Sequence, residues 1–207
     1  MSDGAGAGQD ESAGLRGLQG RAFGLARFVS IVLHPFAVFI ALTVLSVRAM
    51  APQAFGRALI GVSAAVIVSW LFVWQRRRAG HWTTVDASDP RERPLLYLVL
   101  LAVLALSWNW MRGPAPAMAQ GIVAIAAMLI AAAALNGWIK LSLHMASLAF
   151  AAVSLYALWP MLGMAGACLL PLLGWARLRM ARHTLAEVIG GATLGVAFAL
   201  ALRYWAG

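Results

Sequence analysis

Charged residues are scarce in this chain: they make up 11% of its 207 residues, against about 25% in ordinary soluble domains. This scarcity excludes a disordered chain, a coiled coil and a soluble globular enzyme. Hydrophobic residues, in contrast, supply 62% of the sequence. Because one membrane crossing needs about 20 apolar residues, we expect an all-α bundle of six or seven transmembrane helices.

Cysteine and acidic residues are rarer still. The single cysteine, Cys168, cannot form an intrachain disulfide and has no zinc-site spacing around it. Of the aspartates, only Asp86 and Asp89 lie beyond the first 25 residues, which leaves too few for the two aspartate-rich clusters of a magnesium-dependent prenyltransferase. These counts give no indication of a metal site or a cofactor site.

Basic residues outnumber acidic ones, 16 Lys and Arg against 7 Asp and Glu. A basic balance often indicates nucleic-acid binding. Here the cations lie at the ends of apolar segments and not along one polar face. We therefore expect no nucleic-acid partner, and consider two interpretations: positive-inside topology or an anionic substrate at the membrane surface.

The chain divides into a tail and one membrane-embedded domain. Residues 1–25 are rich in Gly, Ala, Ser and acids, which predicts a flexible tail, and residues 26–207 form the domain. The expected apolar segments are roughly 28–47, 58–75, 95–111, 117–138, 143–159, 161–176 and 185–205. The sixth is short for the ~30 Å hydrocarbon layer, so a bundle with one span fewer stays open.

The strongest candidate for chemistry is Arg177-x5-His183-x3-Glu187. If the last span begins near Arg182, His183 and Glu187 share one helix face. The carboxylate can then accept the proton of one imidazole nitrogen and leave the other nitrogen free as a nucleophile. Arg177 adds a guanidinium, whose planar fork suits phosphate oxygens.

Two further polar clusters precede this one. Ser142 and His144 open the fifth segment, where free backbone N–H groups favour anions; Ser142 can donate a hydroxyl and His144 can act as a general acid. Lys140 lies two residues earlier. Arg93 stands directly before a span, with Pro94 suited to its first turn, and Asp86 precedes it by seven residues.

Each of these residues also has a purely structural interpretation. A single interfacial histidine is more often structural than catalytic, and single arginines at helix ends more often snorkel towards water. Asp86 alone is typical of a turn or a cap. His34 and His81 have no motif around them, and we interpret both as structural or solvated.

In combination, the three clusters resemble the type 2 phosphatidic acid phosphatase superfamily, the membrane relatives of vanadium haloperoxidases. The family motifs are K-x6-R-P, P-S-G-H and S-R-x5-H-x3-D, in that order. The corresponding residues here are Asp86-x6-Arg93-Pro94, Leu141-Ser142-Leu143-His144 and Ala176-Arg177-x5-His183-x3-Glu187. The resemblance covers about residues 86–195.

The sequence departs from the family at several motif positions. Asp86 replaces the family lysine and cannot hold phosphate; it can instead orient Arg93 or Arg177. Leucines flank Ser142 in place of Pro and Gly, and Glu187 replaces the final aspartate. Lys140 is our candidate for the missing cation. These differences predict a divergent subgroup.

The resemblance implies a metal-independent mechanism. His183 would attack phosphorus and form a phosphohistidine, while His144 would protonate the departing alkoxide and later activate water. Arg93, Arg177 and Ser142 would stabilise the equatorial oxygens. Phosphoryl transfer of this kind needs mainly positioning and charge stabilisation.

All three clusters must then meet at one membrane face, so residues 145–176 must cross twice. On a count of seven spans, four cations lie on the opposite face: Arg48, Arg57, Arg112 and Arg203. The other twelve lie on the catalytic face: Arg16, Arg21, Arg27, Arg76, Arg77, Arg78, Arg91, Arg93, Lys140, Arg177, Arg179 and Arg182. This imbalance favours a cytoplasmic catalytic face in a cell membrane.

We therefore expect an integral-membrane phosphatase for a lipid phosphate or diphosphate such as phosphatidate, phosphatidylglycerol phosphate or a polyprenyl phosphate. One alternative is a phosphotransferase of the same fold, in which a lipid alcohol replaces water. Another is an inactive relative that acts as a transporter or scaffold. Transport sites often place charges near the membrane midplane, whereas here they cluster at segment ends.

Overall fold

The computed structural model describes residues 20–80, 82 and 92–206, and this part of the chain is a helical bundle without strands. The helix Gly20–Val32 comes first. The elements after it are α2 (Pro35–Met50), η1 (Pro52–Ala54), α3 (Phe55–Arg78), α4 (Arg93–Met111), α5 (Pro116–Leu135), α6 (Leu143–Leu158), α7 (Pro160–Arg179) and α8 (Leu185–Ala206). The all-α fold expected from the composition is confirmed.

Prolines open most of these helices. Pro35, Pro52, Pro94, Pro116 and Pro160 each occupy the first or second position of a helix. There the missing N–H would have had no partner within the helix, and the ring already has a helical φ. Arginines close α3 and α7 in their last turns, where a cation complements the carbonyl end of the helix dipole.

By length and composition, five helical stretches can cross a membrane: η1 with α3, α4, α5, α7 and α8. The helix Gly20–Val32 and α2 form a sixth if taken as one span bent by 40°. The shorter apolar helix α6 adds a seventh apolar segment. The described helices thus indicate a membrane-spanning protein with five or six stretches long enough to cross, against the six or seven expected, because α6 is shorter than a full span.

Three boundaries differ from those expected. Residues 20–25, which we assigned to the tail, are helical, and the first apolar segment is broken at Leu33 and His34. The segment expected to be short, α7, has 20 residues, and α6 with 16 is the short one instead. Helix α6 tolerates its length because other helices surround it, so that ten of its residues are buried.

The closest helix packing is between α6 and α8. A Cβ added at Gly191 would collide with the backbone of Ser142, and one added at Gly195 with the carbonyl oxygen of Ala146. The step from Gly191 to Gly195 along α8 corresponds to the step from Ser142 to Ala146 along α6. Both steps run from the N-terminal towards the C-terminal end, so α6 and α8 are parallel. Glycines at such positions let two backbones touch, and the first turns of the two helices therefore lie side by side.

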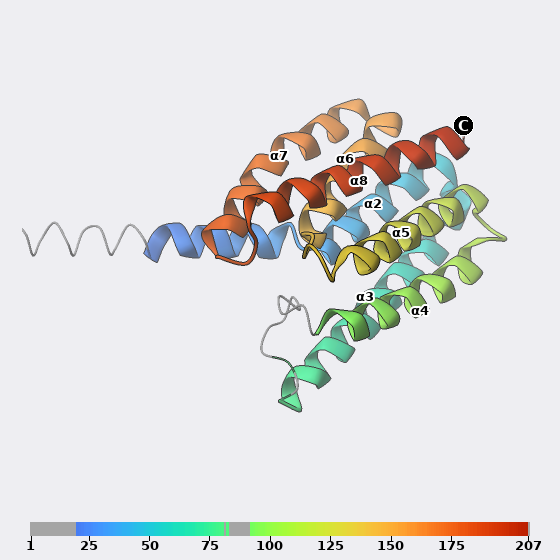
Figure 1. Ribbon diagram of the computed structural model, residues 1–207. Helices are drawn as coiled ribbons and strands as arrows, with labels where there is room; N and C mark the ends of the chain where they lie inside the picture. The colour runs from blue at the N-terminus through green and yellow to red at the C-terminus, as the bar shows by residue number, and fades with distance from the viewer. Residues whose placement is uncertain (1–19, 81, 83–91, 207) are drawn as a thin grey trace, which may run out of the picture.

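Helices α3 and α4 form a separate layer of the bundle. Figure 1 shows them on one side of α2 and α5, while α6, α7 and α8 lie on the other. The layer is joined to the rest through α2–α3 and α4–α5 packing. A cavity lies between the two parts, lined by residues of α2, α3, α4, α5 and α6.

We predict that Gly195→Ala destabilises the protein by about 1–3 kcal/mol, because the added methyl overpacks the α6–α8 contact. Thermal unfolding in detergent measures the effect. Gly121→Ala on α5 is the matched control: nothing lies within 4 Å of the added Cβ, so this change should raise stability slightly. Equal unfolding temperatures for the two variants would contradict the packing described.

Candidate functional site

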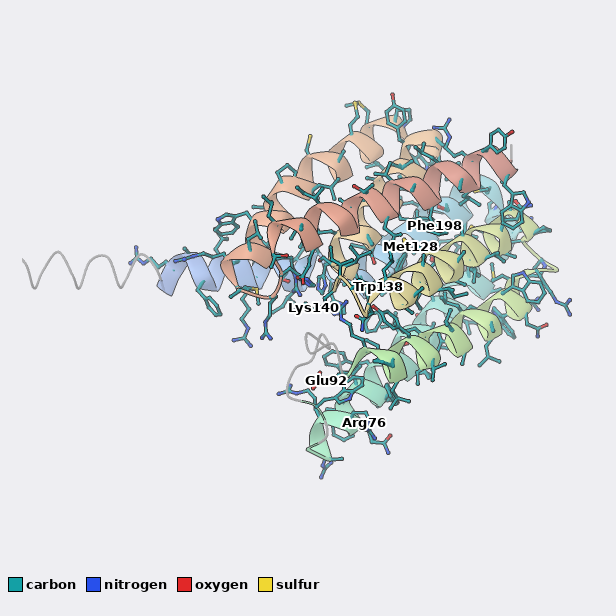
Figure 2. The ribbon with its side chains drawn as sticks, viewed as in Figure 1. Arg76, Glu92, Met128, Trp138, Lys140 and Phe198 are labelled. Atoms are coloured by element: carbon teal, nitrogen blue, oxygen red, sulfur yellow. The ribbon has the colours of Figure 1, made fainter. Side chains whose placement is uncertain are left out.

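The predicted functional residues that the structure describes gather at one end of the bundle, where α4, α6 and α8 begin and α5 and α7 end. Backbone and side-chain hydrogen bonds connect these ends. Figure 2 shows Lys140 and Glu92 at this end, on segments far apart in sequence.

His183 and Glu187 form the central pair of the site. The Nδ1 atom of His183 lies 3.0 Å from Oε2 of Glu187, as the four-residue spacing predicted. His183 does not lie on α8, however: it occupies the turn before the helix, which begins at Leu185. The expected last segment, 185–205, agrees with α8, but the condition that the span begins near Arg182 and includes His183 is not met.

A capping box explains this difference. Thr184 Oγ1 accepts a hydrogen bond from the Glu187 N–H at 3.3 Å, and Glu187 Oε2 accepts one from the Thr184 N–H at 3.1 Å. This reciprocal Ser/Thr-x-x-Glu arrangement marks a helix N-terminus. The same carboxylate oxygen thus caps α8 and holds the imidazole of His183.

The turn before the cap is equally well defined. The Arg182 N–H donates to the carbonyl oxygen of Arg177 at 3.2 Å, and the Ala181 N–H to that of Leu178 at 2.9 Å. These two bonds form the Schellman motif that ends many helices. Its left-handed residue is Ala181, with a φ of 51°, at a position where glycine is usual. A Schellman motif and a capping box therefore hold His183 between them.

The pKa of His183 is lowered to about 4, chiefly by burial of the ring and next by the positive charges of Arg177 and Arg93. The charge of Lys140 contributes least, and the hydrogen bond to Glu187 opposes the shift. The ring is therefore neutral at pH 7. With Nδ1–H donated to the carboxylate, Nε2 carries the lone pair, which is the state a nucleophilic imidazole requires.

Arg93 is buried, with 2% of its surface exposed. One guanidinium nitrogen donates to the carbonyl oxygen of Leu141 at 2.9 Å and lies 3.4 Å from the Tyr97 hydroxyl and 3.5 Å from Oδ1 of Asn136. Arg93 thus ties the start of α4 to the loop before α6. The i,i+4 spacing of Arg93 and Tyr97 was visible in the sequence, but nothing there indicated Asn136.

Arg177 is equally buried and donates to the Ser30 hydroxyl at 2.9 Å. Ser30 belongs to the helix Gly20–Val32, where the sequence has no functional motif. Sequence reasoning missed this residue because the contact spans 147 positions. The helix that precedes α2 is therefore part of the site's framework.

Ser142 and Lys140 contact the turn that carries His183. The Ser142 N–H donates to the carbonyl oxygen of Glu187 at 3.1 Å, and Lys140 Nζ donates to that of Arg182 at 3.0 Å. Ser142 is fully buried, and its hydroxyl has no hydrogen-bond partner within the described residues. A buried hydroxyl of this kind is a donor available to a ligand.

His144 is buried in the first turn of α6, and its ring meets that of His34 edge-on at a centroid distance of 5.0 Å. His34 is the N-cap of α2, with Nδ1 accepting from the Phe36 N–H at 3.3 Å. This cap is the structural role we expected of His34, and the ring is half-buried rather than solvated. Both histidines line the cavity between the helix layers.

Asp86 and His81 lie outside the described residues. Within the described ranges, no three His, Cys, Asp or Glu side chains group closely enough to hold a metal ion. No family model, curated protein or solved structure matches this chain. The family resemblance therefore rests on the motifs alone.

We predict that His183 titrates near pH 4 and that Arg177→Gln raises this value, because removing a nearby positive charge favours the imidazolium. Since the unfolded histidine binds a proton near pH 6.5, the folded state should lose stability as the pH falls from 6.5 towards 4. NMR titration of the imidazole signals, assigned with His183→Gln, measures the pKa. Titration of His183 near pH 6.5 in the parent protein would contradict the burial described.

Proposed function

We propose that the protein is an integral-membrane phosphatase that hydrolyses a lipid phosphate through a phosphohistidine. The observation that carries this proposal is the His183–Glu187 pair: a neutral, oriented imidazole surrounded by the cations Arg93, Arg177 and Lys140. Such a site repels a proton from the imidazole while it attracts an anion. The three sequence motifs support the same chemistry.

In the proposed reaction, Nε2 of His183 attacks phosphorus in line with the bond to the lipid oxygen. The N–P bond forms as the P–O bond breaks, and His144 donates a proton to the departing alkoxide. Water then attacks the phosphohistidine after giving a proton back to His144. The N–P bond breaks, and inorganic phosphate leaves with His183 neutral again.

The remaining residues would stabilise the charge that develops on the phosphoryl group. Arg93 and Arg177 would bind the equatorial oxygens, where charge develops in the transition state. The Ser142 hydroxyl supplies a further donor, and Lys140 raises the local positive potential. Glu187 keeps Nδ1 protonated, so that the attacking nitrogen is always Nε2.

A lipid substrate is favoured by the position of the site. It lies at the end of a membrane-spanning bundle, and His144 is also part of the wall of an apolar cavity. A phosphate group can reach the cations there while its hydrocarbon part stays among the helices. We propose that this end faces the cytoplasm of a cell, because Arg76, Arg77 and Arg78 end α3 near it and the basic excess lies on this side.

We predict that purified protein releases phosphate from a lipid phosphate in the presence of a chelator. His183→Gln should reduce release to background, and Glu187→Gln should lower kcat by a factor of roughly 10²–10⁴, because the imidazole loses its oriented tautomer. Phosphate is measured directly, and a ³²P-labelled substrate should leave an acid-labile, alkali-stable label on the protein.

Arg179→Gln is the matched control, since Arg179 is an exposed cation in the same last turn of α7; it should retain activity. Unchanged activity in His183→Gln would overturn the proposal. Transfer of labelled phosphate to an added lipid alcohol, in place of release, would identify a phosphotransferase. Absence of both reactions in folded protein would favour a transporter or scaffold.

A further inference from the structure

The cavity between the helix layers follows α4 along almost its whole length. Its wall on α4 runs from Leu96 through Leu100, Leu104 and Ser107 to Trp110. At a rise of ~1.5 Å per residue this distance is about 21 Å, which exceeds half of the ~30 Å hydrocarbon layer. The cavity is thus longer than one membrane leaflet is deep.

The two ends of the cavity differ in chemistry. At one end are His34 and His144, beside Ser142 and the site described above. At the other end are Trp110, Met111 and Met118. There a buried apolar cluster, formed by Val47, Ala51, Ala54, Ala58, Met111 and Ala115, fills the space between α2, α3, α4 and α5. The cavity therefore has one end with imidazole groups and one apolar end, which we call the floor.

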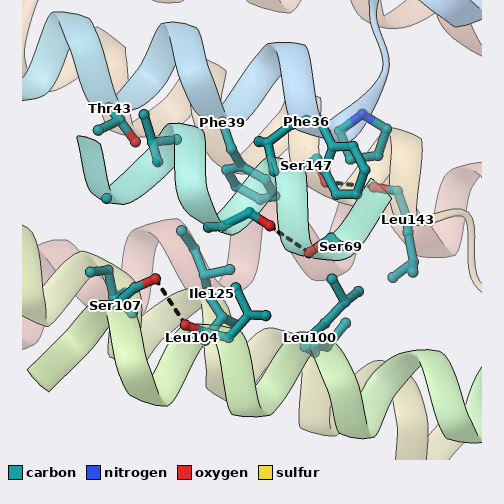
Figure 3. A pocket seen from close by; sticks show the side chains of 18 of the residues that line it. Phe36, Phe39, Thr43, Ser69, Leu100, Leu104, Ser107, Ile125, Leu143 and Ser147 are labelled. Atoms are coloured by element: carbon teal, nitrogen blue, oxygen red, sulfur yellow. Dashed lines mark hydrogen bonds between the residues drawn. The ribbon is translucent and has the colours of Figure 1, made fainter. Parts of the chain in front are cut away.

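Between its ends the cavity offers almost no hydrogen bonds. The hydroxyls of Ser69, Ser107 and Ser147 each donate to the carbonyl oxygen four residues earlier in their own helix, at 2.8 Å. Figure 3 shows these bonds beside Phe39, Leu100 and Ile125. The other lining side chains are almost all apolar. The volume is about 220 Å³, above the ~150 Å³ that holds benzene. An apolar occupant fits this wall, and a polar one does not.

Trp110 is fixed at the floor. Its indole N–H donates to the carbonyl oxygen of Arg57 at 3.0 Å, and the Arg57 guanidinium lies over its ring, 4.8 Å from the centroid. Gly61 faces the same ring: a Cβ added there would approach it to 3.1 Å. A side chain at position 61 would therefore shorten the cavity, and removal of the indole would lengthen it.

We propose that this cavity binds a single long hydrocarbon chain of the substrate, and that Trp110 sets the greatest chain length the enzyme accepts. This inference rests on the proposed phosphatase function. The phosphate lies at the histidine end, and the chain runs between the layers to the floor. A volume of this size spread over about 21 Å describes a narrow tunnel, which selects single-chain phosphates over two-chain glycerolipids.

The test compares decyl, tetradecyl, octadecyl and docosyl phosphate as substrates, with a two-chain phosphatidate beside them. We expect kcat/KM to rise with length, by up to roughly fourfold for each methylene buried, until the chain meets the floor, and then to fall. Trp110→Ala should move the optimum to longer chains, and Gly61→Leu to shorter ones. Phosphatidate should be a poor substrate of all three proteins.

Trp108→Ala is the matched control. Trp108 lies two residues earlier on α4, and the Arg112 guanidinium lies over its ring as that of Arg57 lies over Trp110. Trp108 does not line the cavity. Its loss should therefore leave the preferred chain length unchanged. The same length profile in the parent, Trp110→Ala and Gly61→Leu proteins would overturn the inference while the phosphatase function stood.

If no substrate releases phosphate, a binding experiment still tests the chain-binding cavity independently of the phosphatase function. An octadecyl phosphate with a diazirine at the end of its chain is photolysed on the parent protein, and labelled peptides are identified by mass spectrometry. Labels within residues 107–122, which include Trp110, support the tunnel even without catalysis. Labels confined to the lipid-exposed faces of α4 and α8 would overturn it.

Discussion

The site depends on the contact between α6 and α8 at Gly191 and Gly195. Because these residues lack side chains, the two backbones touch, and the Ser142 N–H reaches the carbonyl oxygen of Glu187. This bond aligns the first turns of two helices whose first residues, Leu143 and Leu185, are 42 positions apart in sequence. The alignment places the buried Ser142 hydroxyl beside the turn that holds His183, so the packing of small residues determines where the polar chemistry sits.

The electrostatic character of the site depends on the groups that accept hydrogen bonds from its three cations. Arg93 donates to a carbonyl oxygen, Arg177 to a hydroxyl and Lys140 to a carbonyl oxygen. Neutral acceptors satisfy the geometry of a cation without cancelling its charge. Together with burial, which has the largest effect, the positive charges lower the pKa of His183. In the proposed function, the same charges would keep the nucleophile neutral and bind the phosphate.

The sequence was sufficient for features that depend on composition or short spacing. Apolar runs predicted the helices, and the i,i+4 spacing predicted the His183–Glu187 contact. The capping box at Thr184 and Glu187 was also readable, and it would have placed His183 before the helix. Long-range partners such as Ser30 and Asn136 could not be predicted, because serine and asparagine carry no periodic signal and their partners depend on packing. The expected segment 143–159 matched α6, whereas the segment 161–176 was too short because α7 continues to Arg179, past the end of its apolar run.

Ala181 has a consequence for the stability of this region. An alanine in the left-handed conformation costs roughly 1–2 kcal/mol, a cost that glycine largely avoids. The segment between α7 and α8, which presents the imidazole of His183, therefore holds a strained residue between two regular helix ends.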